Sequence, residues 1–169
     1  MKTIIKCMVF AVSLGILVFL SACGGSAPQP RDFYSMEQGE PAPPENQGTI
    51  WLGMVKEEQE AAIGPVRDDI GGLRLRYRDG VLKSMTAYTV QLHPVGLTFA
   101  MTQEEIKAYY AADPEVTITE EPNLLTATKT IDGTLYYVRV VFYNDGEIKE
   151  INQTVDPTID ELVFPKNRL

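Results

Sequence analysis

The stretch WLGMVKEEQEAAIGP, residues 51–65, is echoed further along the chain by TFAMTQEEIKAYYAADP, residues 98–114. Sliding the first stretch by 47 positions places Met54 on Met101 and aligns a pair of glutamates in each. A match of this length in a chain of 169 residues is typical of an internal repeat. A second match further along the chain would mark the end of the repeated unit.

That second match lies downstream, where YRDGVLKSM (residues 77–85) aligns with YNDGEIKEI (residues 143–151) at an offset of 66. It places Tyr77 on Tyr143. Two matches in the same order indicate a tandem duplication. The second unit is longer by about 19 residues between these landmarks, which leaves room for an extra hairpin.

Each unit is predicted to begin with a helix. In the second unit Thr102-Gln103-Glu104-Glu105 reads as an S/T-x-x-E capping box, which satisfies free backbone N–H groups at a helix start. Val55 replaces the capping threonine in the first unit, so the first helix is expected to be the looser one. Gly64-Pro65 ends the first helix, and Asp113-Pro114 follows the second.

Tight turns predict antiparallel strands after each helix. Asp79-Gly80, Asp132-Gly133 and Asp145-Gly146 all lie between β-prone runs. The expected strands are residues 73–78, 81–89, 124–131, 135–143 and 147–155. The predicted fold class is α+β: two tandem helix-plus-antiparallel-sheet units, with the helices packed on one sheet face and the other face free.

The N-terminus reads as a targeting segment. Lys2 and Lys6 precede an apolar run of about 14 residues, too short to span a bilayer comfortably. Leu20-Ser21-Ala22-Cys23 resembles the lipobox of bacterial lipoproteins, which implies a signal peptide over residues 1–22 and a diacylglycerol on Cys23. The only other cysteine, Cys7, lies in the discarded segment, so the mature chain has no disulfide or thiolate metal cluster.

Residues 23–47 are interpreted as a disordered tether, because they are rich in Pro, Gly, Ser and acids and poor in aliphatics. Within it, Phe33-Tyr34 either docks on the domain or stays solvated; we expect the solvated state. Residues 48–92 form the first helix-hairpin repeat. Residues 93–169 form the second, longer helix-meander repeat with a C-terminal tail.

Charge narrows the class of partner. The net charge is −8 and becomes −10 once Lys2 and Lys6 are removed. A surface this acidic argues against nucleic acid as a partner and against electrostatic adsorption to anionic lipid. The acyl chains on Cys23 must therefore provide the membrane attachment.

The sequence offers little that points to catalysis. The single histidine, His93, precedes a proline in the connector between repeats, where a surface role is typical. Adjacent acids occur in pairs, but neighbours on a helix point about 100° apart. They read as solvated residues at the helix starts. No phosphate-binding loop or calcium loop is recognisable. We predict that the protein is not an enzyme and binds no cofactor or metal.

The informative surface is the sheet. Leu73, Leu75 and Tyr77 alternate with three arginines, Arg74, Arg76 and Arg78. Aligning Tyr77 with Tyr143 puts Tyr136, Val138, Val140 and Phe142 on the same side as the arginines. The opposite side of that strand is also largely apolar, so the strand is either buried on both faces or exposes an aromatic patch. We hypothesise a partner-binding face formed by Arg74, Arg76, Arg78, Tyr136, Val138, Val140 and Phe142.

A family resemblance follows from the first unit. Gly53-Met54, Ile63-Gly64-Pro65 and the Asp79-Gly80 turn resemble the repeat of the β-lactamase-inhibitor-protein fold and of the small lipoprotein of the outer-membrane β-barrel assembly machinery. The resemblance covers most of residues 48–155. A second resemblance, to the PepSY-like domain, suits the second unit alone. Both families imply protein binding outside the cytoplasm rather than catalysis.

The resulting prediction is a membrane-anchored lipoprotein of the cell envelope that binds an extracytoplasmic protein, as an inhibitor or an assembly scaffold. Gly24 after Cys23 favours the outer membrane where the organism has one. The alternative is a carrier of a small ligand or cell-wall fragment, for which a deep apolar pocket would be diagnostic. A structural spacer would instead show a uniformly charged sheet face.

Overall fold

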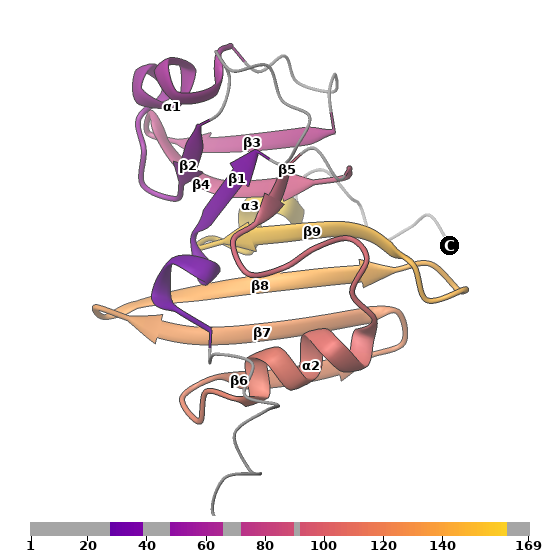
Figure 1. Cartoon of the computed structure of the whole chain (residues 1–169). Coiled ribbons are helices and arrows are strands. Elements are labelled where there is room, and N and C mark those ends of the chain that lie inside the picture. Colours follow the sequence, from indigo (N-terminus) through magenta and orange to yellow (C-terminus); the bar gives the residue numbers. More distant parts are fainter. Residues whose placement is uncertain (1–27, 39–47, 66–71, 90–91, 162–169) are drawn as a thin grey trace, which may run out of the picture.

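The structure, a computed structural model, describes residues 28–38, 48–65, 72–89 and 92–161. The predicted signal peptide and Cys23 lie outside the described residues. Three helices and a short 3-10 helix, η1, accompany nine strands in this part of the chain (Figure 1). Their order is η1 (Pro30–Phe33), β1 (Ser35–Gln38), β2 (Thr49–Trp51), α1 (Lys56–Ile63), β3 (Leu73–Arg78), β4 (Val81–Ala87), β5 (Leu92–Pro94), α2 (Gln103–Ala111), β6 (Thr117–Glu121), β7 (Leu124–Ile131), β8 (Thr134–Phe142), β9 (Ile148–Thr154) and α3 (Thr158–Glu161).

Both principal helices start and stop where predicted. At α2 the Glu105 backbone N–H donates to Thr102 Oγ1 at 3.2 Å, and the Thr102 N–H donates to Glu105 Oε2 at 2.8 Å. The hydrogen bond from the Thr102 N–H, together with one from the Thr102 hydroxyl, holds the pKa of the Glu105 carboxyl below its ordinary value. At α1 Val55 has no side-chain acceptor, so only the return bond from its N–H to Glu58 is made, at 3.3 Å. The first helix start therefore has the weaker cap, as expected.

The turns join the strands as the Asp-Gly pairs predict. Asp79 and Gly80 have φ values of 54° and 74°, and Asp132 and Gly133 have 49° and 79°. Positive φ at both central residues is the requirement of the tight hairpin turn that matches the twist of two paired strands. The five expected strands are confirmed to within two residues, and β6 is the extra strand of the second unit.

The strands of the two predicted units form one sheet, not two. It has six antiparallel strands in the order β3-β4-β9-β8-β7-β6. The hairpin β3–β4 pairs with the last strand of the chain, with Ser84 opposite Thr154 and Ala87 opposite Ile151. The class α+β is confirmed, whereas the junction between units lies inside a continuous sheet.

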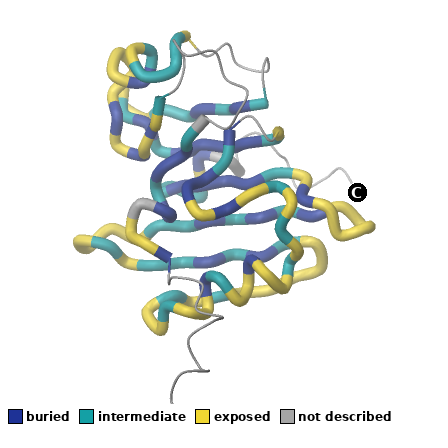
Figure 2. The backbone as a smooth tube through the Cα atoms, viewed as in Figure 1, coloured by how far each residue is buried: buried dark blue, intermediate teal, exposed yellow. Residues whose placement is uncertain are grey.

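One face of this sheet, called the near face, carries the core. Reading the register across all six strands gives the near-face row Leu75, Met85, Gln153, Val138, Ala127 and Ile118. A second layer covers it, made of α2, η1 and a small sheet in the order β2-β1-β5 (Figure 1). Two apolar clusters fill the interface, one around α2 and β7–β9 and the other around β1–β4. The buried backbone accordingly follows the strand centres, while the hairpin ends are exposed (Figure 2).

Part of the expected tether belongs to this layer, so the prediction of a solvated segment is wrong for residues 30–38. Phe33 is fully buried, and its ring centroid lies 5.2 Å from that of Tyr110 on α2. Asp32 accepts hydrogen bonds from the Gln29 N–H, at 2.6 Å, and from the Tyr109 hydroxyl. Its carbonyl accepts from Gln153 Nε2 at 2.8 Å. Composition concealed this docking, because the Phe33 ring, the Asp32 carboxylate and the pairing of β1 with β2 and β5 fix the segment.

Removing the Phe33 ring tests whether this segment holds the fold together. Phe33→Ala is expected to lower the free energy of unfolding by about 3–5 kcal/mol, the usual cost of deleting a buried phenylalanine. Denaturant unfolding measures the loss. Trp51→Ala is the matched control, because Trp51 is 44% exposed and should cost far less. A Phe33 variant as stable as the Trp51 variant would contradict the docking.

Candidate functional site

The far face of the six-stranded sheet, opposite the core, is the candidate site. It carries the row Arg74, Thr86, Asn152, Arg139, Thr126 and Thr119. The next row along it is Arg76, Ser84, Thr154, Tyr137, Thr128 and Thr117. These two rows contain no acidic and no aliphatic residue, in a chain whose net charge is −8.

The hypothesised combination of arginines with the even-numbered residues of β8 is wrong. Tyr136, Val138, Val140 and Phe142 lie on the near face, and the last three are 0%, 0% and 4% exposed. Tyr136 is partly buried against both apolar clusters, and desolvation raises its pKa. The alignment failed because Tyr77 faces the core, whereas Tyr143 is 50% exposed. The two tyrosines are therefore not equivalent, since register and not sequence position sets the face.

The odd-numbered residues of β8 provide the exposed patch instead. Leu135, Tyr137, Arg139, Val141 and, just past the strand, Tyr143 follow one another at the two-residue period. We call them the β8 stripe. Leu135 is 42% exposed and Tyr143 50%. The sequence left two alternatives for this strand, burial on both faces or an exposed aromatic patch. Each holds for one face, because the even-numbered residues are buried and the odd-numbered residues form the patch.

Threonines border the β8 stripe. On β7, Thr126 lies opposite Arg139 and Thr128 opposite Tyr137. On the edge strand β6, Thr117 and Thr119 lie opposite Thr128 and Thr126. This side of the patch therefore offers hydroxyl groups that can both donate and accept hydrogen bonds.

On the other side, the centre of the far face is a closed polar cluster. Asn152 Nδ2 donates to Ser84 Oγ at 2.8 Å and to Thr86 Oγ1 at 2.9 Å. The helix α3 lies behind β4 and β9 (Figure 1), and Ser84 and Thr154 are fully buried. Cross-strand hydrogen bonds of this kind join the hairpin β3–β4 to β9. The cluster is structural and separates the β8 stripe from the arginines.

The three arginines of β3 have different surroundings. Arg78 forms an ion pair with Asp156, just before α3. A hydrogen bond from the Thr158 hydroxyl, aided by the Arg78 charge, lowers the pKa of Asp156. Arg76 has no ion pair with any acid of the described residues, and its buried Nε makes no hydrogen bond there. Arg78 is thus a structural residue, whereas Arg76 has a charge that the described part of the chain leaves uncompensated.

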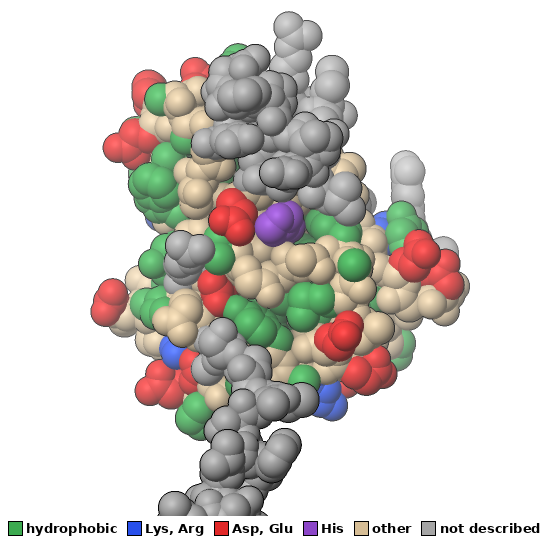
Figure 3. Space-filling view, viewed as in Figure 1, with side chains coloured by type: hydrophobic (Ala, Val, Ile, Leu, Met, Phe, Trp, Pro, Cys, Tyr) green, Lys and Arg blue, Asp and Glu red, His purple; other side chains and the backbone are tan. Residues whose placement is uncertain are grey.

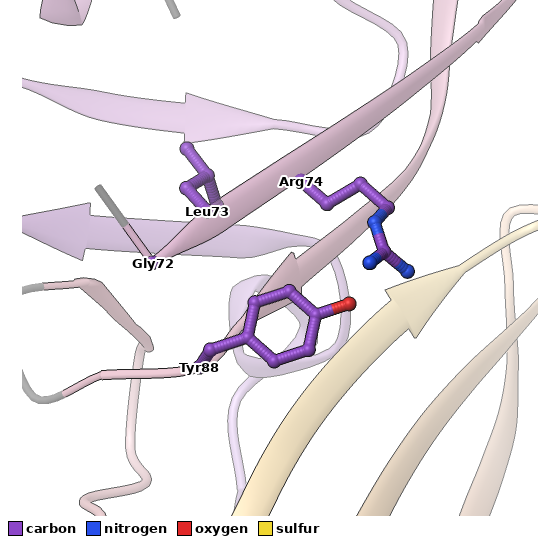
Figure 4. A pocket seen from close by; sticks show the side chains of 4 residues that line it. All are labelled: Gly72, Leu73, Arg74 and Tyr88. Carbon is purple, nitrogen blue, oxygen red and sulfur yellow. The ribbon is translucent and has the colours of Figure 1, made fainter. Parts of the chain in front are cut away.

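Arg74 lines a cavity at the end of the far face. The cavity has a volume of about 290 Å³, and its described walls are Gly72, Leu73, Arg74 and Tyr88. The Arg74 guanidinium carbon lies 5.1 Å from the centroid of the Tyr88 ring. Figure 4 shows the guanidinium beside the hydroxyl end of Tyr88, with the Leu73 side chain pointing away from both.

Histidine and carboxylates give no catalytic set within the described ranges. His93 on β5 lies opposite Glu37 on β1, and its Nδ1 is 3.2 Å from the Pro94 carbonyl oxygen. Among the described residues no group of three or more His, Cys, Asp or Glu side chains is placed to hold a metal. Figure 3 shows the side of the molecule that bears α2 and the small sheet, where acidic side chains are scattered and basic ones are few.

Cys23, the predicted lipidation site, lies outside the described residues. None of the helices in the described ranges is both long enough and apolar enough to cross a membrane. Comparison with known proteins adds no relative: no family model matches the chain, and no match was found among curated proteins or solved structures.

Two features of the site escaped sequence reasoning. Tyr88 has no local signal, because its role depends on its contact with Arg74 across the first hairpin. The β8 stripe did have a local signal, since most residues of 135–143 are apolar at odd and at even positions alike. That pattern identifies two apolar faces without saying which of them is buried.

A matched pair of valines on β8 tests the assignment of the faces. Val138→Ala should lower the free energy of unfolding by about 2 kcal/mol, because it removes fully buried methyl groups. Val141→Ala makes the same change on the far face, where the side chain is only partly buried, and should cost clearly less. Denaturant unfolding of both variants gives the comparison. A larger loss for Val141 would reverse the faces.

Proposed function

We propose that this chain is a lipid-anchored lipoprotein of the cell envelope that binds an extracytoplasmic protein through the β8 stripe. Its role is that of an inhibitor or assembly scaffold, without catalysis and without a cofactor. The anchor is Cys23, on the extracytoplasmic side of a membrane and on the outer membrane where the organism has one. The observation that carries the binding function is the exposure of Leu135 and Tyr143 at the two ends of the stripe.

The composition of the β8 stripe supports a protein partner. Tyrosine and arginine are enriched in protein interfaces, and Tyr137 and Arg139 lie in the middle of the stripe. Aliphatic and aromatic groups adjoin them, and hydroxyl-bearing threonines form one border. The strand belongs to the interior of the sheet, so its side chains are held on a rigid support.

The tandem origin of the two units is part of the proposal. Each unit places a methionine shortly before a capped helix and then antiparallel strands. Met54 is 2% exposed within the cluster around β1–β4, whereas Met101 is only partly buried, against the cluster around α2 and β7–β9. The resemblance to the β-lactamase-inhibitor-protein repeat, or to the PepSY-like domain, is likewise proposed.

The small-ligand alternative has a specific feature in its favour, the cavity beside Arg74 and Tyr88. A small ligand in this cavity would not cover the β8 stripe. The cavity opens at β3 and β4, whereas the stripe lies on β8, and the closed cluster around Asn152 separates them.

The lipid anchor predicts that Cys23→Ala releases the protein from membranes. Two acyl chains give stable attachment, and the acidic surface offers no electrostatic substitute. Fractionation of cells, with labelled fatty acid as tracer, measures both retention and acylation. Retention of the variant together with label would contradict the anchor.

The binding face predicts a loss of partner without a loss of fold. A photoreactive amino acid placed at Tyr137 in intact cells should cross-link to a defined partner. The double variant Leu135→Ser with Tyr143→Ser should reduce that product at least tenfold, because it removes the two exposed apolar ends of the stripe. Thermal unfolding should change little. Val55→Ser is the matched control, since Val55 is 38% exposed and lies off the stripe. Undiminished cross-linking in the double variant would place the interface elsewhere.

A further inference from the structure

We propose that strand β6 pairs with β6 of a second copy of this chain, so that two six-stranded sheets join edge to edge. β6 is the last strand of its sheet, and within the described residues it pairs with β7 alone (Figure 1). A strand in this position presents backbone N–H and C=O groups with which another strand can pair. The proposal depends neither on the lipid anchor nor on the protein partner of the β8 stripe.

The register of the neighbouring strands fixes which backbone groups of β6 point outward. The Phe142 N–H donates to the Asn123 carbonyl at 2.9 Å, just before β7, and bonded pairs alternate with non-bonded ones along an antiparallel ladder. The odd-numbered residues of β7 therefore bond to β8, and the even-numbered ones bond to β6. Their partners on β6 are Thr117, Thr119 and Glu121. The N–H and C=O groups of Ile118 and Glu120 point away from the sheet, and they have no hydrogen-bond partner among the described residues.

β6 lacks the features that usually block an exposed edge. Natural edge strands are often interrupted by a proline or a bulge, or they carry uncompensated charge. Residues 117–121 contain no proline, and their register with β7 runs without a shift. The charge of Glu120 is balanced by Lys107 on α2, whose Nζ lies 2.5 Å from Glu120 Oε1. The first three residues of the strand are β-branched, which favours an extended backbone. The edge is therefore suited to pairing.

The sequence of β6 is self-complementary when two copies pair antiparallel about Thr119. The outward groups of Ile118 then bond to those of Glu120 in the second copy, and the symmetry repeats these bonds. Thr119 lies opposite its own counterpart, a favourable cross-strand pair, and Glu121 lies opposite Thr117. No glutamate of this strand stands opposite another, so the acidic residues of the edge do not repel each other directly. A two-fold axis relates the copies, as in most homodimers. This symmetry is the reason for choosing a second copy as the occupant.

The same axis brings both copies to one membrane through the proposed lipid anchor. An axis perpendicular to the sheet keeps the two near faces on one side. The layer that contains η1 covers the near face, so the chain enters the described part on that side in both copies. Both β8 stripes then lie on the other side, five strand spacings apart, which is roughly 24 Å at the usual distance between strands. The pair of copies presents two stripes on one surface.

An engineered disulfide tests the register. Thr119 and its counterpart form a non-hydrogen-bonded pair across the interface, with Cα atoms about 4.5 Å apart, which is within the range of a disulfide. Thr119→Cys should therefore give a covalent dimer when cells that carry the full chain are mildly oxidised. Thr117→Cys is the matched control, because it lies on the same face of the same strand but about 13 Å from its own counterpart. The unaltered chain, treated in parallel, shows any product that comes from Cys23. Absence of a dimer from Thr119→Cys, or an equal yield from Thr117→Cys, overturns the proposal.

A proline tests the backbone bonds themselves. Glu120→Pro removes an outward N–H and leaves the bonds to β7 intact, which an edge strand tolerates. It should lower the disulfide yield of the Thr119→Cys chain at least tenfold, whereas Glu120→Ala keeps the N–H and should retain the yield. Thermal unfolding checks that both variants fold; should Glu120→Pro not fold, the comparison of Thr119→Cys with Thr117→Cys decides. An undiminished yield in folded Glu120→Pro overturns the proposal.

A strand from another protein would give a different combination of results. In that case Thr119→Cys forms no dimer, while Glu120→Pro abolishes the cross-link made from Tyr137 to the protein partner. That outcome overturns the pairing of two copies and assigns the β6 edge to the partner. A dimer through Thr119→Cys in the absence of any cross-link from Tyr137 supports the pairing and contradicts the proposed β8 interface instead.

Discussion

The backbone pairing of β4 with β9 is the constraint on which the rest of the structure depends. It joins the hairpin of the first unit to the last strand of the second, and the Asn152 side chain reinforces it with hydrogen bonds to Ser84 and Thr86. Because side chains alternate along a strand, this register decides the face on which every residue of both units lies. A shift by one residue would exchange the core of one unit with its surface.

As a consequence, the two faces of the six-stranded sheet differ: one holds the core and the other remains largely without apolar cover. The near face takes the small sheet, α2 and η1, and holds the apolar clusters. Of those elements, η1 and β1 precede the first repeat, whereas α2 belongs to the second. The far face then needs no large apolar cover. It retains exposed aromatic groups on β8 and arginines on β3, where contact with another molecule does not disturb the core.

The β8 stripe and the arginines of β3 occupy different parts of that far face. Arg139 and Arg74 share one row but are three strand spacings apart, roughly 14–15 Å at the usual distance between strands. The closed cluster of Asn152, Ser84 and Thr86 lies between them. The arginines of β3 therefore lie apart from the β8 stripe.

The sequence by itself determined the elements of this protein. Helix starts at Val55 and Thr102, and the turns at Asp79-Gly80 and Asp132-Gly133, depend on local chemistry: a capping side chain or a positive φ. The docking of Phe33, the merging of two hairpins into one sheet and the exposed side of β8 were decided only by the tertiary structure. Each depends on pairing between residues far apart in the chain, and an apolar strand with two similar sides has no local signal for which side is buried. Register supplies that information, because it is fixed by the neighbouring strand.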